Sequence, residues 1–522
     1  MLDIFKNHRL LYLFGISITI IGMPYSHVIM SIGMFWLAVV WLLEGKTIVR
    51  FKSFFKNKPA LSLSLFFIIH VIGLLYSQDW NHGLKDLRIK LPLLFLPIVF
   101  STTSVRFKKK DLELLLHIFV GAVLFFSIYG YLVFKGFLPS KFEEKTYRSL
   151  SYFISHVRFA IEICFAFFIL LRWVYKRNKY WLLYSLISIW LIFFLIQMQS
   201  ITGFIILPIT GFLILIREIQ KSNKKKIVFG LSIIALSILG GSFWYISKEY
   251  NTYFTYKEDV NALPEKTIHG EKYLHEDNNQ LENGYYLWKN FAQREFILAW
   301  CKRSELDYQD KDKQGNIVGF TARRYVTSKG LKKDKEGIYS LTDQDMKNIE
   351  NGIHTIVPQK SGISSRLNDI FYEIDHYRNT GDPSGQSLSQ RIEAFSIGIK
   401  MLKANWIYGT GTGDIHNDFI NAYDTYNSKL SEEFRIRAHN QYLIFFVTFG
   451  ILGGIICLLC FIYPIWQLKK QHSYYYVAFI LCIAVSFTWG NTLETQAGLT
   501  FFAVFNPLLL FHFNKSNAPI DS

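Results

Sequence analysis

Long apolar runs separated by short polar loops dominate the first half of the chain and return near its end. A run of about 17 to 25 apolar residues can cross a lipid bilayer as a helix. The run at 91–104 is shorter, and its prolines Pro92 and Pro97 predict a kinked or partly buried helix. The pattern therefore predicts an all-α polytopic membrane protein with about twelve transmembrane helices. These runs lie near 9–23, 26–43, 59–76, 91–104, 112–134, 155–173, 180–198, 200–216, 227–246, 440–466, 473–490 and 497–513.

A long polar stretch, roughly residues 247 to 436, separates the ninth run from the tenth. Within it, the turn-forming sequences DKDKQGN and KDKEG flank the β-prone run Ile317 to Val326, a pattern that predicts a β-hairpin. Thr342 or Asp343 can cap the short helix that follows. We expect three parts: an N-terminal membrane bundle of about nine spans, a loop domain of mixed α-helix with a small β-hairpin, and about three C-terminal spans with a short tail. Their expected ranges are 1–246, 247–439 and 440–522.

Positive charge gathers in alternate loops between the apolar runs. Lys46 and Lys52 follow the second run, and Arg106 and Lys108 follow the fourth. Because cytoplasmic loops of membrane proteins are enriched in Lys and Arg, these loops and both termini are expected to be cytoplasmic. The same alternation places the long polar stretch on the outer, periplasmic face. It also accounts for the net charge of +17 without requiring nucleic acid as a partner.

The composition excludes several other classes of protein. With 51% hydrophobic and 17% aromatic residues, the chain is a poor fit to a soluble α/β enzyme. Of the five cysteines, only Cys301 falls outside the apolar runs, so no disulfide framework is expected. The first run lacks a following cleavage site with small residues, which argues against a removed signal peptide. No cluster of His, Cys and carboxylates with metal-ligand spacing is visible, and no metal or other cofactor is expected.

The stretch from Arg391 to Gly454 brings together the residue types that a lipid-linked substrate would require. Arg391 opens a basic amphipathic segment, where an anion would be favoured by the arginine and by helix N–H groups. The apolar stripe of this helix can lie on the membrane surface or pack on the bundle. Gly409, Gly411 and Gly413 in YGTGTGD can present N–H groups to a phosphate, and a helix-ending turn explains them equally well. The stripe consists of Ile392, Phe395, Ile399 and Leu402.

A histidine and an asparagine, His439 and Asn440, open the tenth apolar run at the outer face. An imidazole moves protons near neutral pH, so His439 at the lip of a membrane cavity could deprotonate an incoming sugar hydroxyl. A lone histidine at an interface is more often structural. The neighbouring cations Arg435 and Arg437, together with Arg391, favour the catalytic interpretation of His439.

Three further clusters at the outer face are candidates to complete an anion site. Arg158 stands out because it falls within an apolar run, and an arginine in the membrane requires a partner or a cavity. The cations of the other loops can be ordinary loop charges, and Glu494 can be a salt-bridge partner. The clusters are Arg88 with Lys90, Arg148 with His156 and Arg158, and Glu494.

These motifs resemble a known family. Arg391 with Trp406, then YGTGTGD, AHNQYL and FGILGG, look like the shared domain of O-antigen ligases and O-antigen polymerases. The match covers roughly 391 to 454, and SHVRFAIE at 155–162 and LETQAGLTFFAVF at 493–505 are similar more loosely. By this resemblance His439 matches the catalytic histidine and Arg391 the arginine that contacts the diphosphate.

The resemblance implies a metal-independent membrane glycosyltransferase of the ligase type, which inverts the anomeric carbon. The donor would be a glycan on undecaprenyl diphosphate at the periplasmic face of the bacterial inner membrane, and the acceptor lipid A-core. The alternatives are an O-antigen polymerase, a protein O-oligosaccharyltransferase and, more distantly, a lipid-linked glycan transporter. One departure is Ser200-Ile201-Thr202, where family members commonly have Ser-Arg-Thr. Arg158, with Arg148 behind it, is the expected substitute for the missing arginine.

Overall fold

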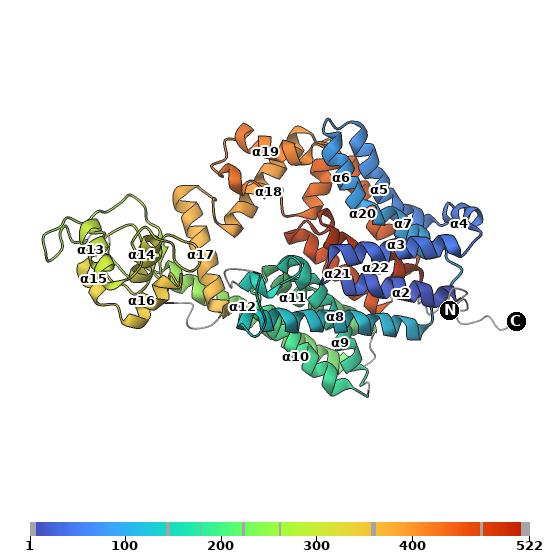
Figure 1. Cartoon of the computed structure of the whole chain (residues 1–522), viewed down its shortest axis with the longest axis horizontal. Coiled ribbons are helices and arrows are strands. Elements are labelled where there is room, and N and C mark those ends of the chain that lie inside the picture. Colours follow the sequence, from blue (N-terminus) through green and yellow to red (C-terminus); the bar gives the residue numbers. More distant parts are fainter. Residues whose placement is uncertain are drawn as a thin grey trace.

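Helices occupy all twelve of the predicted apolar runs in the computed structural model (Figure 1). The structure describes residues 7–141, 147–177, 179–221, 225–259, 263–356, 362–469 and 473–512. The helices in the apolar runs are α2 (His8–Gly22), α3 (His27–Leu43), α5 (Lys58–Leu75), α7 (Pro92–Thr102), α8 (Lys109–Lys135), α9 (His156–Tyr175), α10 (Trp181–Gln197), α11 (Ile201–Lys221), α12 (Lys225–Phe254), α20 (Gln441–Gln467), α21 (Tyr474–Trp489) and α22 (Gln496–Phe511).

Length and composition support a membrane protein but identify fewer than twelve crossings. Among the described residues, four helices are long and apolar enough to span a membrane: α5, α8, α11 and α20. A fifth candidate combines α3 with α4 (Thr47–Phe54), which meet at a bend of 111°. The helices α2, α10, α21 and α22 are apolar but shorter. The total of about twelve spans, and the orientation of the termini, therefore stay predictions.

Aromatic side chains fill the interior of the helical bundle. Phe119 and Phe505 meet edge to face with ring centroids 5.1 Å apart, and Phe165 meets Phe479 in the same way at 5.4 Å. Such pairs contribute roughly 0.5 to 1.5 kcal/mol each beyond the burial of their area. Other large apolar side chains, including Phe35, point outward. Outward apolar faces of this kind are what a bundle in contact with lipid would present.

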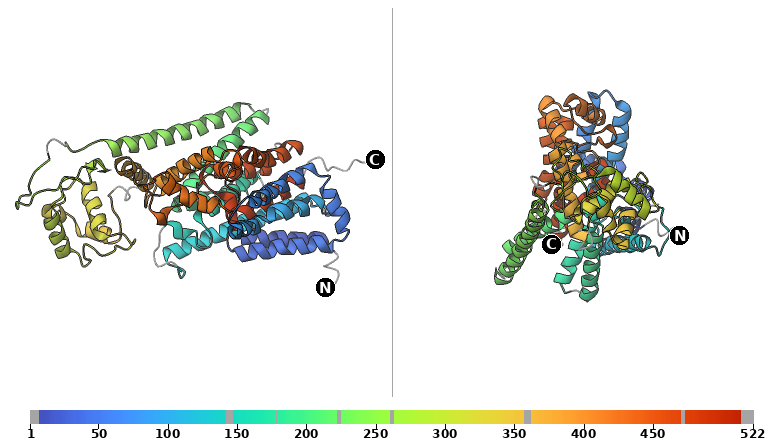
Figure 2. Two further views of the ribbon diagram at one scale, coloured as in Figure 1. Left: turned by 90° about the horizontal axis from the view of Figure 1, so that it is seen from above. Right: turned by 90° about the vertical axis from the view of Figure 1, so that its left-hand side faces the viewer.

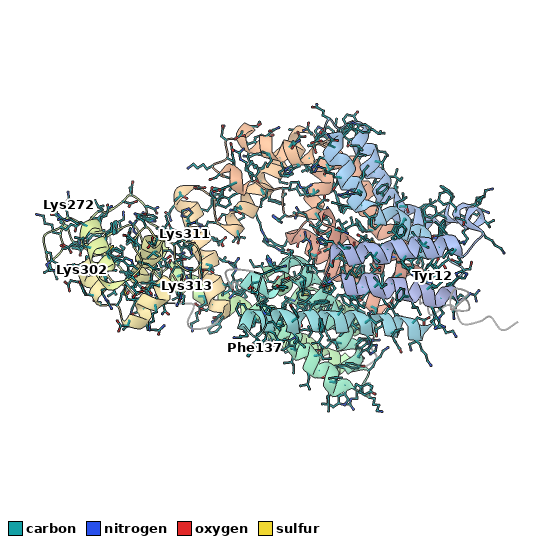
Figure 3. The ribbon with its side chains drawn as sticks, in the orientation of Figure 1. Tyr12, Phe137, Lys272, Lys302, Lys311 and Lys313 are labelled. Carbon is teal, nitrogen blue, oxygen red and sulfur yellow. The ribbon has the colours of Figure 1, made fainter. Side chains whose placement is uncertain are left out.

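The predicted loop domain contains a compact helical lobe set apart from the bundle (Figures 1 and 2). The long helix α12 runs along the bundle toward it, and α17 (Gly362–Thr380) lies between the lobe and the bundle. Trp300 and Tyr325 are completely buried in the lobe's own core. Its surface carries exposed lysines, among them Lys272, Lys302, Lys311 and Lys313 (Figure 3). The lobe consists of α13 (Gln293–Arg303), α14 (Val318–Ser328), α15 (Lys335–Tyr339) and α16 (Asp343–Glu350).

The β-hairpin predicted around Ile317 to Val326 is wrong, because this segment forms helix α14. Its buried residues Val318, Ala322 and Val326 follow the period of a helix rather than that of a strand. The structure has its hairpin earlier, where β1 (Leu281–Glu282) pairs antiparallel with β2 (Tyr285–Tyr286) across Asn-Gly. Both turn residues have positive φ, as the favoured two-residue hairpin turn requires. The predicted cap is confirmed, since Thr342 begins α16 in a reciprocal capping box with Asp345.

Between the lobe and α20, two helices build the outer part of the bundle. The helices α18 (Ser387–Ala404) and α19 (Ile415–Thr425) share a small core with the start of α20. In α18 the residues facing this core are Ala394, Ile397 and Met401, whereas Ile392 and Phe395 are exposed. Ile399 and Leu402 pack partly against this core, so half of the predicted apolar stripe packs on the bundle and only Ile392 and Phe395 are left for contact with the membrane surface.

Helix α20 is broken at Gly450, and the glycine-rich turn fills the break. Gly450 has φ 67° and ψ −174°, a region that essentially only glycine occupies. The amide of Ile451 donates to the carbonyl of Trp406 at 2.8 Å, and Thr410 donates its amide to the carbonyl of Val447 at 2.9 Å. Non-helical backbone at membrane depth requires such replacement hydrogen bonds, because lipid offers none. The turn therefore belongs to the fold of α20.

The phosphate-binding interpretation of YGTGTGD is therefore wrong. The amides of Gly411, Thr412 and Gly413 donate to the carbonyls of Thr448 and Gly73 and to the Ser77 hydroxyl at 2.9 to 3.2 Å. These three amides already have acceptors within the protein, so they are not available to a phosphate. Gly409 and Gly411 have positive φ, and a Cβ at Gly409 would collide with the backbone of Thr448. The glycines are required by close backbone packing.

We expect Gly450→Ala to destabilise the protein. The backbone conformation alone costs of order 1 to 3 kcal/mol for a residue with a side chain, and a Cβ would also collide with the Ile407 carbonyl. Thermal unfolding in detergent, followed by size-exclusion chromatography, measures the effect. Gly121→Ala is the matched control, since a Cβ there meets nothing within 4 Å in helix α8. Equal unfolding temperatures for the two variants would contradict the assigned role of the break.

Candidate functional site

His439 lies just before α20, and three arginines act on it electrostatically. Burial, followed by the charges of Arg391, Arg158 and Arg437, lowers the pKa of His439 to about 4. These arginines come from α18, from α9 and from the segment that leads into α20. The side chain of His439 is half-buried. The structure thus brings a neutral imidazole together with cationic groups from distant parts of the chain.

Arg158 is held in place by the loop between α21 and α22. Its Nε donates to Thr495 Oγ1 at 2.8 Å, and its Nη2 donates to the carbonyl of Asn491 at 2.8 Å. Both acceptors are neutral oxygens, so these bonds orient the guanidinium without neutralising its charge. Arg158 is therefore a fixed cation near His439, which is the property that an anion-binding arginine needs.

Arg391 reaches the site from within α18 and not from its beginning. The helix starts four residues earlier than the sequence predicted, at Ser387. One amide of the first turn, that of Leu388, donates to the Glu373 carboxylate at 2.5 Å. Arg391 therefore does not lie at the helix start, where free N–H groups were expected to help it hold an anion. The contribution of Arg391 rests on its own guanidinium.

Asn440 is the N-cap of α20. Its Oδ1 accepts from the amide of Leu443 at 2.9 Å, and its Nδ2 donates to the carbonyl of Thr488 at 3.2 Å. The cap satisfies one of the free amides of the first turn, and the second bond ties α20 to α21. These contacts fix the backbone next to His439. A role for Asn440 in binding substrate stays a prediction.

Glu494 is the centre of a buried ionic network beside His439. Its carboxylate accepts from Lys90 Nζ at 2.9 Å and from Gln441 Nε2 at 2.9 Å, and Arg437 Nη1 lies 3.6 Å away. Lys90 also binds Asp86, at 2.6 Å. Burial alone would raise the pKa of Glu494, but Lys90 and Arg437 outweigh it and keep the pKa well below its usual range. The glutamate stays ionised and links the loop after α21 to the His439 segment.

The network is connected to both sides of the site. Gln441 Oε1 accepts from the amide of Leu493 at 2.9 Å, so the first residue of α20 holds the loop that carries Glu494. The same loop contains Asn491 and Thr495, the two partners of Arg158. One set of buried polar contacts therefore fixes the positions of Arg437, Arg158 and His439 relative to one another.

We expect Lys90→Met to destabilise the protein by about 3 to 5 kcal/mol, the usual cost of removing one partner from a buried ion pair. Lys90 is 1% exposed, and its loss leaves the carboxylates of Asp86 and Glu494 without their shared cation. Thermal unfolding in detergent measures the change. Lys85→Met, at an exposed position of the same helix, is the control. The double variant Lys90→Met with Glu494→Gln should recover part of the loss, and no recovery would contradict the pairing.

Among the described side chains, the hydrogen bonds and ion pairs given above for this cluster do not involve the other predicted residues. Arg88 is exposed on α6 (Trp80–Lys90), and His156 is the first residue of α9. Arg148 lies in the short helix η1 (Tyr147–Leu150), but its side chain is outside the part of the chain that the structure describes. Arg435 binds Asp424 at 2.8 Å. The proposed contacts of Arg88, Arg148 and His156 with substrate stay predictions.

Two members of the buried network, Asp86 and Gln441, were not among the residues singled out from the sequence. Asp86 precedes Lys90 by four residues on α6, and this spacing is a visible sign of a helical ion pair. Gln441 follows the His-Asn pair directly and has no sequence signal of its own. Only the fold shows that it bridges to Glu494.

Residues 337–458 match the family model described as O-antigen ligase. This range includes Arg391, the glycine-rich turn, His439 and most of α20. This part of the chain is therefore similar to the O-antigen ligase family. The resemblance inferred from the sequence motifs is thus confirmed, and no curated protein matches the chain.

The O-antigen ligase match covers only part of the site. Arg158, Lys90 and Glu494 all lie outside the matched range, on α9, α6 and the loop before α22. The family domain supplies His439, Arg391 and Arg437, and the rest of the bundle supplies the groups that hold or complement them. The match supports an O-antigen ligase or polymerase type of activity in lipopolysaccharide biosynthesis, with lipid-linked glycans as general partners.

Proposed function

We propose that the protein is an O-antigen ligase that transfers a glycan from an undecaprenyl diphosphate carrier to lipid A-core at the periplasmic face of the bacterial inner membrane. The observation that carries this proposal is the convergence of Arg391, Arg158 and Arg437 on His439. A diphosphate requires fixed cations, and the attacking hydroxyl requires a base. The four side chains supply both within one site.

The proposed reaction is a single displacement. The acceptor hydroxyl oxygen attacks the anomeric carbon, the bond from that carbon to the diphosphate oxygen breaks, and the diphosphate leaves with the electron pair. His439 accepts the hydroxyl proton, and attack from the opposite face inverts the anomeric carbon. Arg391 and Arg158 stabilise the leaving diphosphate, because guanidinium groups match phosphate oxygens bidentately and remain charged. Such fixed cations provide the electrostatic stabilisation that a metal would otherwise supply.

The arrangement of the loops supports the proposed sidedness. The beginnings of α9 and α20 and the loop between α21 and α22 meet at the end of the bundle that carries His439. The loops with clustered Lys and Arg, such as that after α3, are expected at the cytoplasmic end. Ser200, at the position of the family's Ser-Arg-Thr motif, is buried and lies directly before α11. Because Ile201 stands where the family has its arginine, and Arg158 is a fixed cation, we keep Arg158 as the substitute for that arginine.

The proposal is tested by transfer with the purified protein in detergent. The donor is a glycan on undecaprenyl diphosphate, the acceptor is lipid A-core, and a chelator is present throughout. We expect lipid A-core bearing the complete glycan as product. Extension of one carrier-linked glycan by another would instead identify a polymerase, and glycosylated protein would identify an oligosaccharyltransferase. Carrier-linked glycan that crosses a vesicle membrane without being consumed would overturn enzymatic transfer altogether.

The pH dependence should separate the free enzyme from the donor complex. With a pKa of about 4 for His439, the free enzyme loses its base only as the pH falls through about 4. The acid limb of kcat/KM for the donor should lie there, with a plateau above it. A bound diphosphate neutralises the arginines that depress this pKa, so the acid limb of kcat should lie at higher pH. The assignment of His439 as the base would be contradicted if the acid limb of kcat fell at the same pH as that of kcat/KM, or at a lower pH.

A further inference from the structure

A second polar site lies next to the proposed transfer site, in a hollow of about 730 Å³ at the outer end of the bundle. It is bounded by the loop between α5 and α6, by the glycine-rich turn and by one face of α19. Its polar side chains include Asp79, Asn405, Asp414, Asn417, Asp418 and Asn421. No lysine or arginine is among the described residues that line it. Its character is thus opposite to that of the arginine cluster.

The hollow faces the polar side of an amphipathic helix. On α19 the buried residues Ile415, Phe419 and Tyr423 form the core side. Asp414, Asp418 and Asn421 follow one another at helical spacing on the side that lines the hollow. A helix with one packed face and one amide-rich face over a hollow can present that second face to a polar ligand.

Part of the hydrogen-bonding capacity in the hollow is used by the fold, and part is not. The Asp414 carboxylate accepts from the amides of Gln78 and Asp79, at 2.7 to 3.0 Å, and so orders the loop before α6. In contrast, the side chains of Asn405, Asp418 and Asn421 make no hydrogen bond to any described residue. Burial and the nearby Asp414 raise the pKa of Asp418. Carboxylates and amides without counter-cations suit a ligand that donates hydrogen bonds.

We propose that this hollow is the subsite for a sugar of the acceptor glycan, bound through its hydroxyl groups. Carboxylate and amide oxygens accept hydrogen bonds from sugar hydroxyls, whereas the negative charge of three aspartates would repel the donor diphosphate. The aromatic ring of Tyr76 borders the hollow and offers an apolar face to a sugar ring. The inference rests on the proposed function, because it takes the hydroxyl-bearing substrate to be a glycan.

Two interactions connect the helices beside the hollow to the segment that carries Arg437. His416 on α19 stacks on His82 of α6 with ring centroids 5.4 Å apart. Arg437, two residues before His439, acts electrostatically on His416 and lowers its pKa after the larger effect of burial. Helix α6 also carries Lys90 of the buried network at its other end. The elements that line the hollow are thus linked to the segment that carries Arg437 and His439.

Binding measurements test the subsite without relying on transfer. The probes are core oligosaccharide released from the host's lipopolysaccharide by mild acid, and farnesyl diphosphate as a donor-site probe, each titrated calorimetrically. In the variant Asn405→Ala with Asn421→Ala, oligosaccharide should bind about 10-fold or more weakly, because two hydrogen bonds are lost, and farnesyl diphosphate should bind as before. Both asparagines are exposed, so the variant should fold. Asn81→Ala, exposed on α6 outside the hollow, is the control.

The outcomes separate this inference from the proposed function. Unchanged oligosaccharide binding in the double variant, or a requirement for calcium ions in binding, would overturn the subsite. If transfer is observed, the variant should raise the KM for the acceptor and leave the KM for the donor unchanged. An unchanged acceptor KM would overturn the subsite while leaving the transferase intact. Binding that depends on the hollow, together with no transfer from any diphosphate carrier, would instead overturn the proposed function alone.

Discussion

Replacing His439 by alanine should reduce glycan transfer by about 10²- to 10⁴-fold, the usual contribution of a positioned general base. The imidazole is neutral above about pH 4 and can accept the hydroxyl proton throughout the physiological range. The measurement is the single-turnover rate with carrier-linked glycan in detergent. Binding of the diphosphate should persist, because Arg391 and Arg158 remain. The expected signature is therefore a loss of kcat with little change in the donor KM.

The control for His439 is His27→Ala, at an exposed position where α3 begins. This variant should transfer at the normal rate. His439→Ala protein that remains folded and retains full activity would refute the assignment of the base. A variant that no longer binds the donor would show that His439 holds the diphosphate and not the acceptor proton.

Replacing Arg391 by glutamine should lower kcat/KM for the donor by roughly 10- to 150-fold, the worth of one hydrogen bond to a charged group. Arg391→Lys should recover only part of this loss, because an ammonium cannot form the bidentate contact. The substitution to glutamine also removes the largest electrostatic cause of the low pKa of His439. The acid limb of the pH profile should therefore move to higher pH.

Lys403→Gln is the matched control for Arg391, since it removes an exposed cation from the same helix. A lysine on an exposed face of an interfacial helix ordinarily extends only toward lipid headgroups or water, so the control should leave transfer unchanged. The same loss in both variants would indicate that α18 acts through its general positive charge. An unshifted acid limb in Arg391→Gln would show that the guanidinium lies too far from the imidazole to act on it.

The sequence motifs include residues that interact in the fold, but they did not predict all of the local structure. Arg391, Arg158 and Arg437 act electrostatically on His439, and the roles of all four side chains stay proposals. The prediction of local structure failed where short sequence patterns fit both a helix and a strand. The β-branched residues in the run from Ile317 to Val326 suggested a strand, but the helical period of its buried residues prevailed. The Asn-Gly hairpin at Asn283 and Gly284 was visible in the sequence and was overlooked.

The glycine-rich turn shows why a motif is insufficient without its surroundings. A G-x-G-x-G sequence specifies backbone freedom but not what the freed amides will bind. Here α20 breaks at Gly450, and the turn donates to the carbonyls near the break. The sequence of the turn does not indicate that its amides will donate to carbonyls of α20, because the break lies some 40 residues downstream in the sequence. The hydrogen bonds that exclude phosphate binding are therefore visible only in the fold.

The sequence by itself determined that the chain is rich in apolar helices and that part of it is similar to the O-antigen ligase family. Hydrophobic run length and local motifs are properties of neighbouring residues, so they can be read without a fold. Only the tertiary structure decided that Lys90, Glu494 and Arg437 form one buried network, and that Asn405 and Asn421 share a hollow. The physical reason is that charge pairing and cavities depend on distances between residues far apart in the chain, which packing of the helices sets.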